Sequence, residues 1–183
     1  MNDKERIDKS ETAHLYIAIR RTKENRESGL KEVCFRHVIR DDEKDLQFIK
    51  QRISGIPGVW RIYKTVNARN FEEARKVLIT KLVQDPENWM YRVDSLWKTC
   101  LLQPQCKAER KFLIDIDIKD LDVESKVVDI FHENHVHIVH TIGTPNGVHL
   151  VVEKFDTRLI EGIKDVEFKR DGYVFVERIE NGT

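Results

Sequence analysis

The sequence lacks a long apolar run and a paired-cysteine motif, and each absence excludes a class of protein. No stretch approaches the roughly 18 apolar residues that a membrane-spanning helix needs, and the N-terminal segment MNDKERIDKSET is too polar for a signal peptide. The three cysteines show no CxxC spacing, which is typical of free thiols in a reducing compartment and not of a disulfide framework. We therefore expect a cytoplasmic, intracellular protein with no membrane partner.

The chain also lacks a net charge. Lys and Arg together number 32, as do Asp and Glu, which gives a formal net charge of +0 and a pI near 7.1. No global field therefore attracts nucleic acid, so a function on nucleic acid must rest on local basic patches. The 183 residues are enough for one well-buried core or for two small lobes that share one.

The first half of the chain alternates between strand and helix periodicity. We predict a hairpin of strands 14–21 and 33–39, a helix from Asp41 or Asp42, a strand 59–66, a helix capped by Asn70, and a helix opened by Asp85 and Pro86. The segment QPQCKAER then predicts a boundary within one compact molecule. Residues 1–106 would form an N-terminal α/β lobe with a basic strand, and residues 107–183 a second region.

The second region has the element order βαββαβ, which predicts an α+β fold with a ferredoxin-like, or RRM-like, sheet. The expected strands are KFLIDIDI, VHIVHTI, VHLVVEKF and DVEFKRDGYVFVERI, the last as one strand or a hairpin, with a helix capped by Asp122 after the first. In this topology the first and third strands are antiparallel neighbours, and the fourth lies beside the first. The end of the first strand should therefore lie against the start of the third.

Two carboxylates and a histidine stand at those two positions. Asp115 and Asp117 alternate with Ile114, Ile116 and Ile118, so both should project from one face of the strand. Adjacent carboxylates repel each other unless a cation lies between them, which favours Mg²⁺ or Mn²⁺. An ordinary solvated strand face is the alternative.

The turn TPNG precedes the strand that carries His149. Its amides, with Thr144, Asn146 and Gly147, suit the oxygens of a nucleotide phosphate, and the histidine could donate to one of them. A tight hairpin turn needs no ligand, however, so this motif gains its weight from the predicted position opposite Asp115 and Asp117.

These motifs resemble the archaeo-eukaryotic primase superfamily of primases and primase-polymerases, in the form of a small phage-type catalytic core. The similar parts are FLIDID, TPNGVHLVV and a later acidic residue at a strand, and RIYKTVNARN is more loosely similar to a basic strand before the core. The resemblance implies a nucleotidyltransferase that uses two divalent metals to join nucleotides on a template. It implies nucleoside triphosphates, single-stranded DNA and replication proteins as partners, and a phage-encoded protein that acts inside a host cell.

The third carboxylate of such a site stays open among four residues. Asp171 is our choice, because the start of the fourth strand should reach the same edge and because KRDG looks most like the family's third motif. Glu167 is next, and Asp165 and Glu177 remain alternatives. The assigned metal ligands and catalytic residues are thus Asp115, Asp117 and Asp171.

Basic residues for a triphosphate or a template are expected on the strand 59–66 and after the third strand. Arg61 and Lys64 are the first candidates, with Trp60 beside them as a base-stacking side chain. The further candidates are Arg69, Arg158, Lys169 and Arg170.

Three other interpretations of the sequence compete with a primase-type function. The histidines of FHENHVHIVH could bind zinc, but alternation puts His137 and His140 on opposite faces of a strand. A metal-dependent nuclease would use the same carboxylates on water. A non-catalytic nucleic-acid-binding module would need exposed aromatic side chains where this sequence has aspartates and a histidine.

Overall fold

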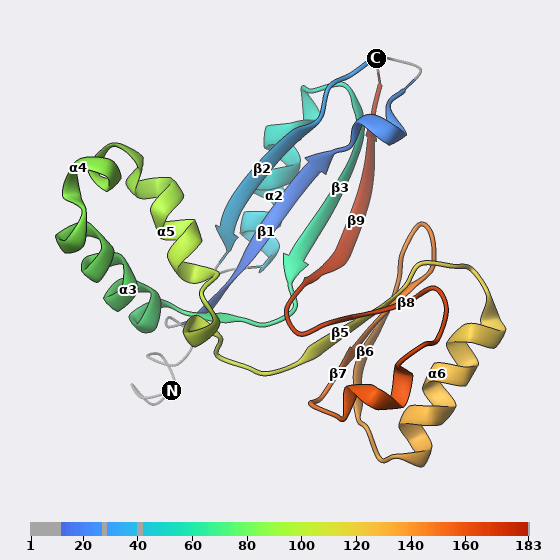
Figure 1. Ribbon diagram of the computed structural model, residues 1–183. Helices are drawn as coiled ribbons and strands as arrows, with labels where there is room; N and C mark the ends of the chain where they lie inside the picture. Colours follow the sequence, from blue (N-terminus) through green and yellow to red (C-terminus); the bar gives the residue numbers. More distant parts are fainter. Residues whose placement is uncertain (1–11, 27–28, 40–41, 183) are drawn as a thin grey trace, which may run out of the picture. The chain divides into compact units, whose positions relative to one another are not determined.

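The computed structural model describes residues 12–26, 29–39 and 42–182, which form an α+β fold with two antiparallel sheets (Figure 1). In the first part of the chain the elements are β1 Thr12–Arg20, β2 Val33–Ile39, α2 Asp42–Ser54, β3 Gly58–Thr65, β4 Arg69–Asn70, α3 Phe71–Gln84, α4 Pro86–Trp89 and α5 Val93–Leu101. They continue with β5 Phe112–Ile116, α6 Leu121–Glu133, β6 Ile138–Gly143, β7 Val148–Val152, β8 Val166–Lys169 and β9 Tyr173–Asn181.

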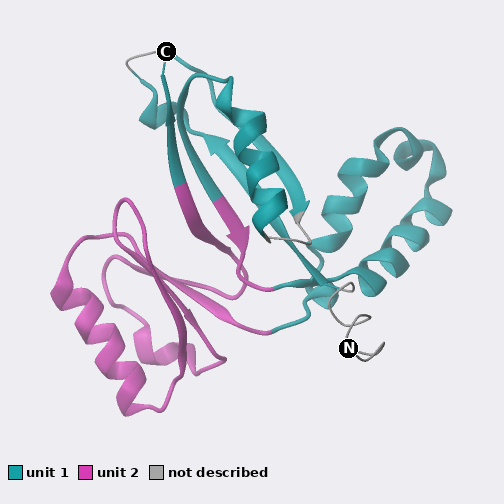
Figure 2. Ribbon diagram, turned by 180° about the vertical axis from the view of Figure 1, so that it is seen from behind, with its two compact units in different colours: residues 1–62, 68–109, 178–183 teal, residues 63–67, 110–177 magenta. Residues whose placement is uncertain are grey.

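The chain divides into two compact units, coloured separately in Figure 2. Unit 1 consists of residues 1–62, 68–109 and 178–183, and unit 2 consists of residues 63–67 and 110–177. The division after Glu109 lies close to the boundary that QPQCKAER predicted. Two short segments were not predicted to cross this boundary: residues 63–67 belong to unit 2, and residues 178–183 belong to unit 1.

Unit 1 contains the predicted β1–β2 hairpin, which pairs antiparallel from His14 opposite Ile39 to Arg20 opposite Val33. The predicted cap of α3 is also confirmed, since the Asn70 side chain accepts a hydrogen bond from the Glu73 amide at 3.0 Å. The single helix expected after Asp85 is wrong. A 3₁₀ turn at Met90–Arg92 separates the four-residue α4 from α5.

Unit 2 is built on the four-stranded sheet β6-β7-β5-β8, in which every neighbouring pair is antiparallel. This is the predicted order, with the first and third strands central and the fourth beside the first. The crossover before β8 holds only the 3₁₀ turn Thr157–Ile160, where the order βαββαβ predicted its second helix. The cap of α6 is Asp120 and not Asp122, because the Asp120 carboxylate accepts the Asp122 amide at 2.9 Å.

The last predicted element is wrong in a way that matters for the site. Residues 165–179 form neither one strand nor a hairpin, because β8 pairs with β5 whereas β9 belongs to the sheet β2-β1-β3-β9. The chain bends between them at Arg170 and Asp171. The Asp-Gly pair therefore sends the chain from one sheet to the other.

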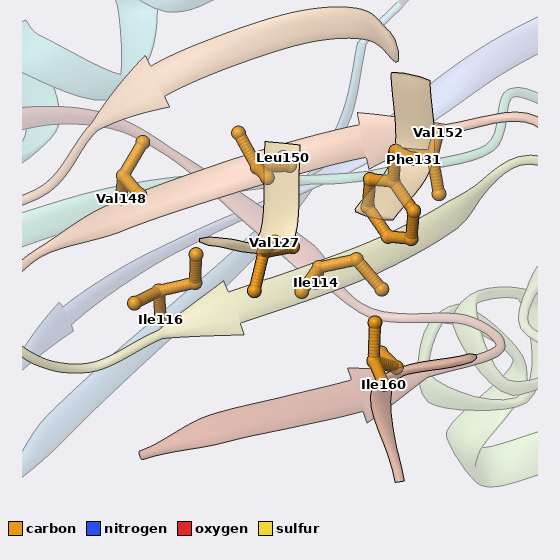
Figure 3. Packing of buried hydrophobic residues seen from close by; sticks show 8 residues of the cluster. All are labelled: Ile114, Ile116, Val127, Phe131, Val148, Leu150, Val152 and Ile160. Atoms are coloured by element: carbon orange, nitrogen blue, oxygen red, sulfur yellow. The ribbon is translucent and has the colours of Figure 1, made fainter. Parts of the chain in front are cut away.

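One face of the unit 2 sheet is an apolar core that α6 covers (Figure 3). Alternate residues of β5 and β7 point into this core, together with side chains of α6 and of the turn before β8. The buried members are Ile114, Ile116, Val127, Phe131, Val148, Leu150, Val152 and Ile160. Since strand side chains alternate, Leu113, Asp115, His149 and Val151 lie on the opposite face.

Within the described residues, no helix has the length and apolar character needed to cross a bilayer.

Candidate functional site

The register of unit 2 brings three polar residues together on the second face of its sheet. Asp115 lies opposite His149 of β7 on one side and opposite Glu167 of β8 on the other. The prediction that the end of the first strand lies against the start of the third is therefore confirmed. Lys169 follows Glu167 by two positions and projects from the same face.

Asp115 is the centre of this cluster, and both of its carboxylate oxygens are engaged. Oδ1 lies 3.3 Å from Nε2 of His149, and Oδ2 accepts a hydrogen bond from Nζ of Lys169 at 2.7 Å. The same ammonium lies 3.0 Å from Oε2 of Glu167. Exposure rises outward, from 7% for the His149 side chain to 21% for Asp115 and 68% for Glu167.

These contacts keep Asp115 ionised. The hydrogen bond from His149 lowers the pKa of the Asp115 carboxyl, the bond from Lys169 lowers it further, and together they outweigh burial, so that the pKa falls from 3.8 to about 2. Burial would lower the pKa of the Lys169 ammonium, but its contacts with Asp115 and Glu167 outweigh that effect and raise it. The cluster therefore holds one cation between two carboxylates at neutral pH.

His149 acts on Asp115, and its ring is not open to solvent. Nδ1 accepts a hydrogen bond from the Phe175 amide at 3.1 Å, so Nε2 carries the proton and donates to Asp115. The residue is 6% exposed. Both ring nitrogens of His149 therefore have partners within the protein, and one of these contacts orients the Asp115 carboxylate.

Two segments of unit 2 lie over the inner part of this face. Val66 and Val174 pack against Leu113 and Val151. The side-chain amide of Asn67 donates a hydrogen bond to the Lys111 carbonyl at 3.0 Å and accepts one from the Lys111 backbone N–H at 2.7 Å. The same neighbourhood supplies the Phe175 amide to His149. The inner end of the cluster is therefore sealed, whereas Glu167 and Asp117, the residue just after β5, are exposed to solvent.

The TPNG turn packs tightly against the end of β5 and uses its own polar groups internally. A Cβ on Gly147 would lie 2.0 Å from the Ile116 carbonyl oxygen, so only glycine fits there. The Thr144 amide donates to the Gly147 carbonyl at 2.8 Å, and the Gly147 amide donates to the Thr144 hydroxyl at 3.0 Å. Two of the amides expected to bind phosphate are therefore occupied, while the exposed Asn146 lies between them in the turn.

The structure separates the three proposed metal ligands. Asp117 follows the end of β5 and is exposed, and its amide bonds the Asp165 carbonyl at 3.2 Å. Asp171 lies beyond the other end of β5, because Lys169 is already opposite Leu113, and its carboxylate accepts from Asn67 at 3.4 Å. Asp171 is therefore not brought to Asp115, whereas its runner-up Glu167 lies directly opposite Asp115.

The first basic candidates, Arg61 and Lys64, belong to different units. Arg61 belongs to unit 1, where it is buried and ion-paired with Glu24. Lys64 belongs to unit 2 and is half-buried. Trp60 is wrong as a base-stacking residue, because it is fully buried, stacks on Phe35 at 5.7 Å and donates to the Ile56 carbonyl.

The other basic candidates also differ in burial and in their partners. Arg69 is buried in unit 1, and Arg158 is exposed and paired with Asp156. Lys169 is the one of this set whose contact with Asp115 the structure shows.

The histidine-rich segment gives no zinc site. His137 lies 3.5 Å from Glu153, and among the residues that the structure describes no three His, Cys, Asp or Glu side chains are grouped in a way that could hold a metal ion. The same result applies to Asp115, Asp117 and Glu167, so a preformed three-ligand cage is not present there either. Asp115 and Glu167 instead share the ammonium of Lys169.

Comparisons with known protein families, with characterised proteins and with solved structures found no match to this chain. A function for this chain is therefore inferred from the residues of the site itself.

Proposed function

We propose that the chain is a primase-type nucleotidyltransferase whose ferredoxin-like unit 2 binds Mg²⁺ or Mn²⁺ at the open end of β5. The observation that carries the proposal is the convergence of Asp115 and Glu167 on a single cation, with the exposed Asp117 two residues after Asp115 in the chain. The order β6-β7-β5-β8 supports the ferredoxin-like description, in which the second helix is reduced to a 3₁₀ turn.

The donor set fits a hard divalent ion. Such ions prefer carboxylate oxygens, and Mg²⁺ at a nucleotide site usually takes one or two carboxylates from the protein and completes its shell with water and substrate phosphates. Asp115 and Glu167 are two carboxylates that already share a positive charge, and Asp117 is an accessible third. When bound, the ion would neutralise phosphate charge and activate a hydroxyl group for attack on a nucleoside triphosphate.

The protein's own residues would orient and ionise the ligands. His149 fixes Asp115 in place, because its ring is itself held by the Phe175 amide. The low pKa of Asp115, about 2, keeps this carboxylate ionised at neutral pH. Glu167 and Asp117 are exposed and can adjust to an ion and a substrate.

The same residues bear on the two alternative functions, a nucleic-acid-binding module and a nuclease. A nucleic-acid-binding module of RRM type needs aromatic side chains on the open face of the central strands, but this face holds Leu113, Asp115, His149 and Val151. A nuclease would use the same carboxylates, so it differs from a primase only in its product.

A labelled-strand assay separates these functions. The wild-type chain is incubated with Mn²⁺, nucleoside triphosphates, a single-stranded DNA template and a labelled primer. We expect new or lengthened strands, and we expect Asp117→Asn, which alters an exposed residue, to reduce the product at least tenfold. Shortened strands would establish the nuclease instead, and an unchanged strand pool in the presence of Mn²⁺ would overturn both enzymatic proposals.

A further inference from the structure

Lys169 is in an unusual place for a residue of a metal-binding face. Its ammonium lies 2.7 Å from Asp115 and 3.0 Å from Glu167, which are the two carboxylates that the proposed function assigns to a divalent ion. Its side chain is 31% exposed, so the ion pair is partly shielded from water. A metal ion and this ammonium would compete for the same oxygens.

The register explains why the protein needs a cation here. Asp115 and Glu167 are directly opposite each other on neighbouring strands, where two negative charges destabilise a sheet. Lys169 follows Glu167 by two residues, so β8 itself carries the compensating charge to the same face. The side chain is long and flexible enough to leave without disturbing the strand.

We propose that Lys169 is the resident cation of this site, and that a divalent ion binds by displacing its ammonium from Asp115 and Glu167. This inference rests on the proposed metal site and adds to it the residue that sets its affinity. Lys169 thereby holds the carboxylates together without metal and makes metal binding weaker than the carboxylates alone would allow. A structural ion pair with no such role would not respond to metal.

The inference is tested with Lys169→Met, which removes the charge and keeps most of the side chain's length. The matched control is Lys126→Met, which removes an exposed lysine from α6, on the covered side of the same sheet. Both variants change the net charge equally, so a general electrostatic effect would appear in both. Mn²⁺ affinity is measured by isothermal titration, and thermal stability is measured with and without Mn²⁺.

We expect Lys169→Met to bind Mn²⁺ at least tenfold more tightly than wild type and Lys126→Met to bind like wild type, because only Lys169 opposes the ion at contact distance. We also expect the metal-free Lys169→Met protein to melt at a lower temperature than wild type, and Mn²⁺ to restore more of its stability than it adds to wild type.

Two other results are informative. If wild type and Lys169→Met bind Mn²⁺ equally, and Asp115→Asn removes that binding, the metal site stands and the role of Lys169 is refuted. If neither protein binds Mn²⁺, the metal site and the inference both fail, and a lower melting temperature that Mn²⁺ does not restore identifies a purely structural ion pair.

Discussion

The two faces of the unit 2 sheet are made by the same strands and have opposite chemistry. On one face Ile114, Ile116 and Leu150 are fully buried under α6. On the other face Asp115 and His149 alternate with them and form a charged network that is open to solvent at its outer end. The difference shows how a two-residue period lets five-residue strands support a rigid core and position a polar site at once.

The largest expected loss of stability comes from removing a side chain that packs on the covered face. Phe131→Ala should lower the free energy of unfolding by about 3–5 kcal/mol, because the fully buried ring fills the core between α6 and the sheet. Urea denaturation measures the change. Leu121→Ala is the matched control on the same helix, where a side chain that is 78% exposed should matter by less than about 0.5 kcal/mol. Equal losses in the two variants would contradict the assignment of the two faces.

The next largest loss of stability is expected at the TPNG turn, which joins β6 to β7. Gly147→Ala should destabilise the protein by about 1–3 kcal/mol, because its Cβ would clash with the backbone of Ile116 and Ile118, which cannot move aside cheaply. Gly143→Ala is the control in the same hairpin, since a Cβ there meets nothing within 4 Å. Thermal denaturation of the two variants should differ clearly. Similar melting temperatures would show that the turn does not pack against β5 as described.

The polar face should contribute a smaller, pH-dependent stabilisation. The pKa of Asp115 is lowered from 3.8 to about 2 in the folded protein, so its contribution is complete above about pH 5 and is lost as the pH falls through 3.8 toward 2. Asp115→Asn should therefore cost about 2 kcal/mol at pH 7 and flatten the stability profile between pH 4 and 2. The exposed Asp117→Asn serves as the control. A wild-type profile that is already flat in that range would refute the ion-pair network.

The smallest effect concerns the end of the helix that covers the core. His135 has a φ of 55°, a left-handed conformation that favours glycine, and the Val136 amide closes the helix end by donating to the Phe131 carbonyl at 2.8 Å. His135→Gly should therefore raise the free energy of unfolding by about 0.5–1 kcal/mol. Asn134→Gly, at a φ of −99°, should not. Destabilisation by His135→Gly, measured in urea, would mean that the histidine has contacts that outweigh its strain.

The sequence predicted the part of the site that depends on strand order. Alternation and the order βαββαβ were enough to place Asp115 opposite His149, because both signals are local and the topology relates them. The fourth strand was harder. Asp171 and Gly172 gave a turn signal, but a turn does not specify which sheet the next strand joins, so the choice between Asp171 and Glu167 needed the register.

The sequence could not predict which charged side chains are buried or which residues they contact. Arg61 is an ordinary basic strand residue until Glu24, far away along the chain, is seen beside it. Lys169 gave equally little sign that it would lie between two carboxylates. The one available hint was its spacing of two residues from Glu167, which places both side chains on one face.

In the proposed site, Asp115 and Glu167 of unit 2 bind a divalent ion. Glu167→Gln and Asp171→Asn neutralise two carboxylates of the same segment, at opposite ends of the β5–β8 pair, and their Mn²⁺ affinities can be compared by isothermal titration. We predict that Glu167→Gln weakens binding at least tenfold, while Asp171→Asn binds as wild type does. A loss of binding in Asp171→Asn with unchanged affinity in Glu167→Gln would contradict this prediction.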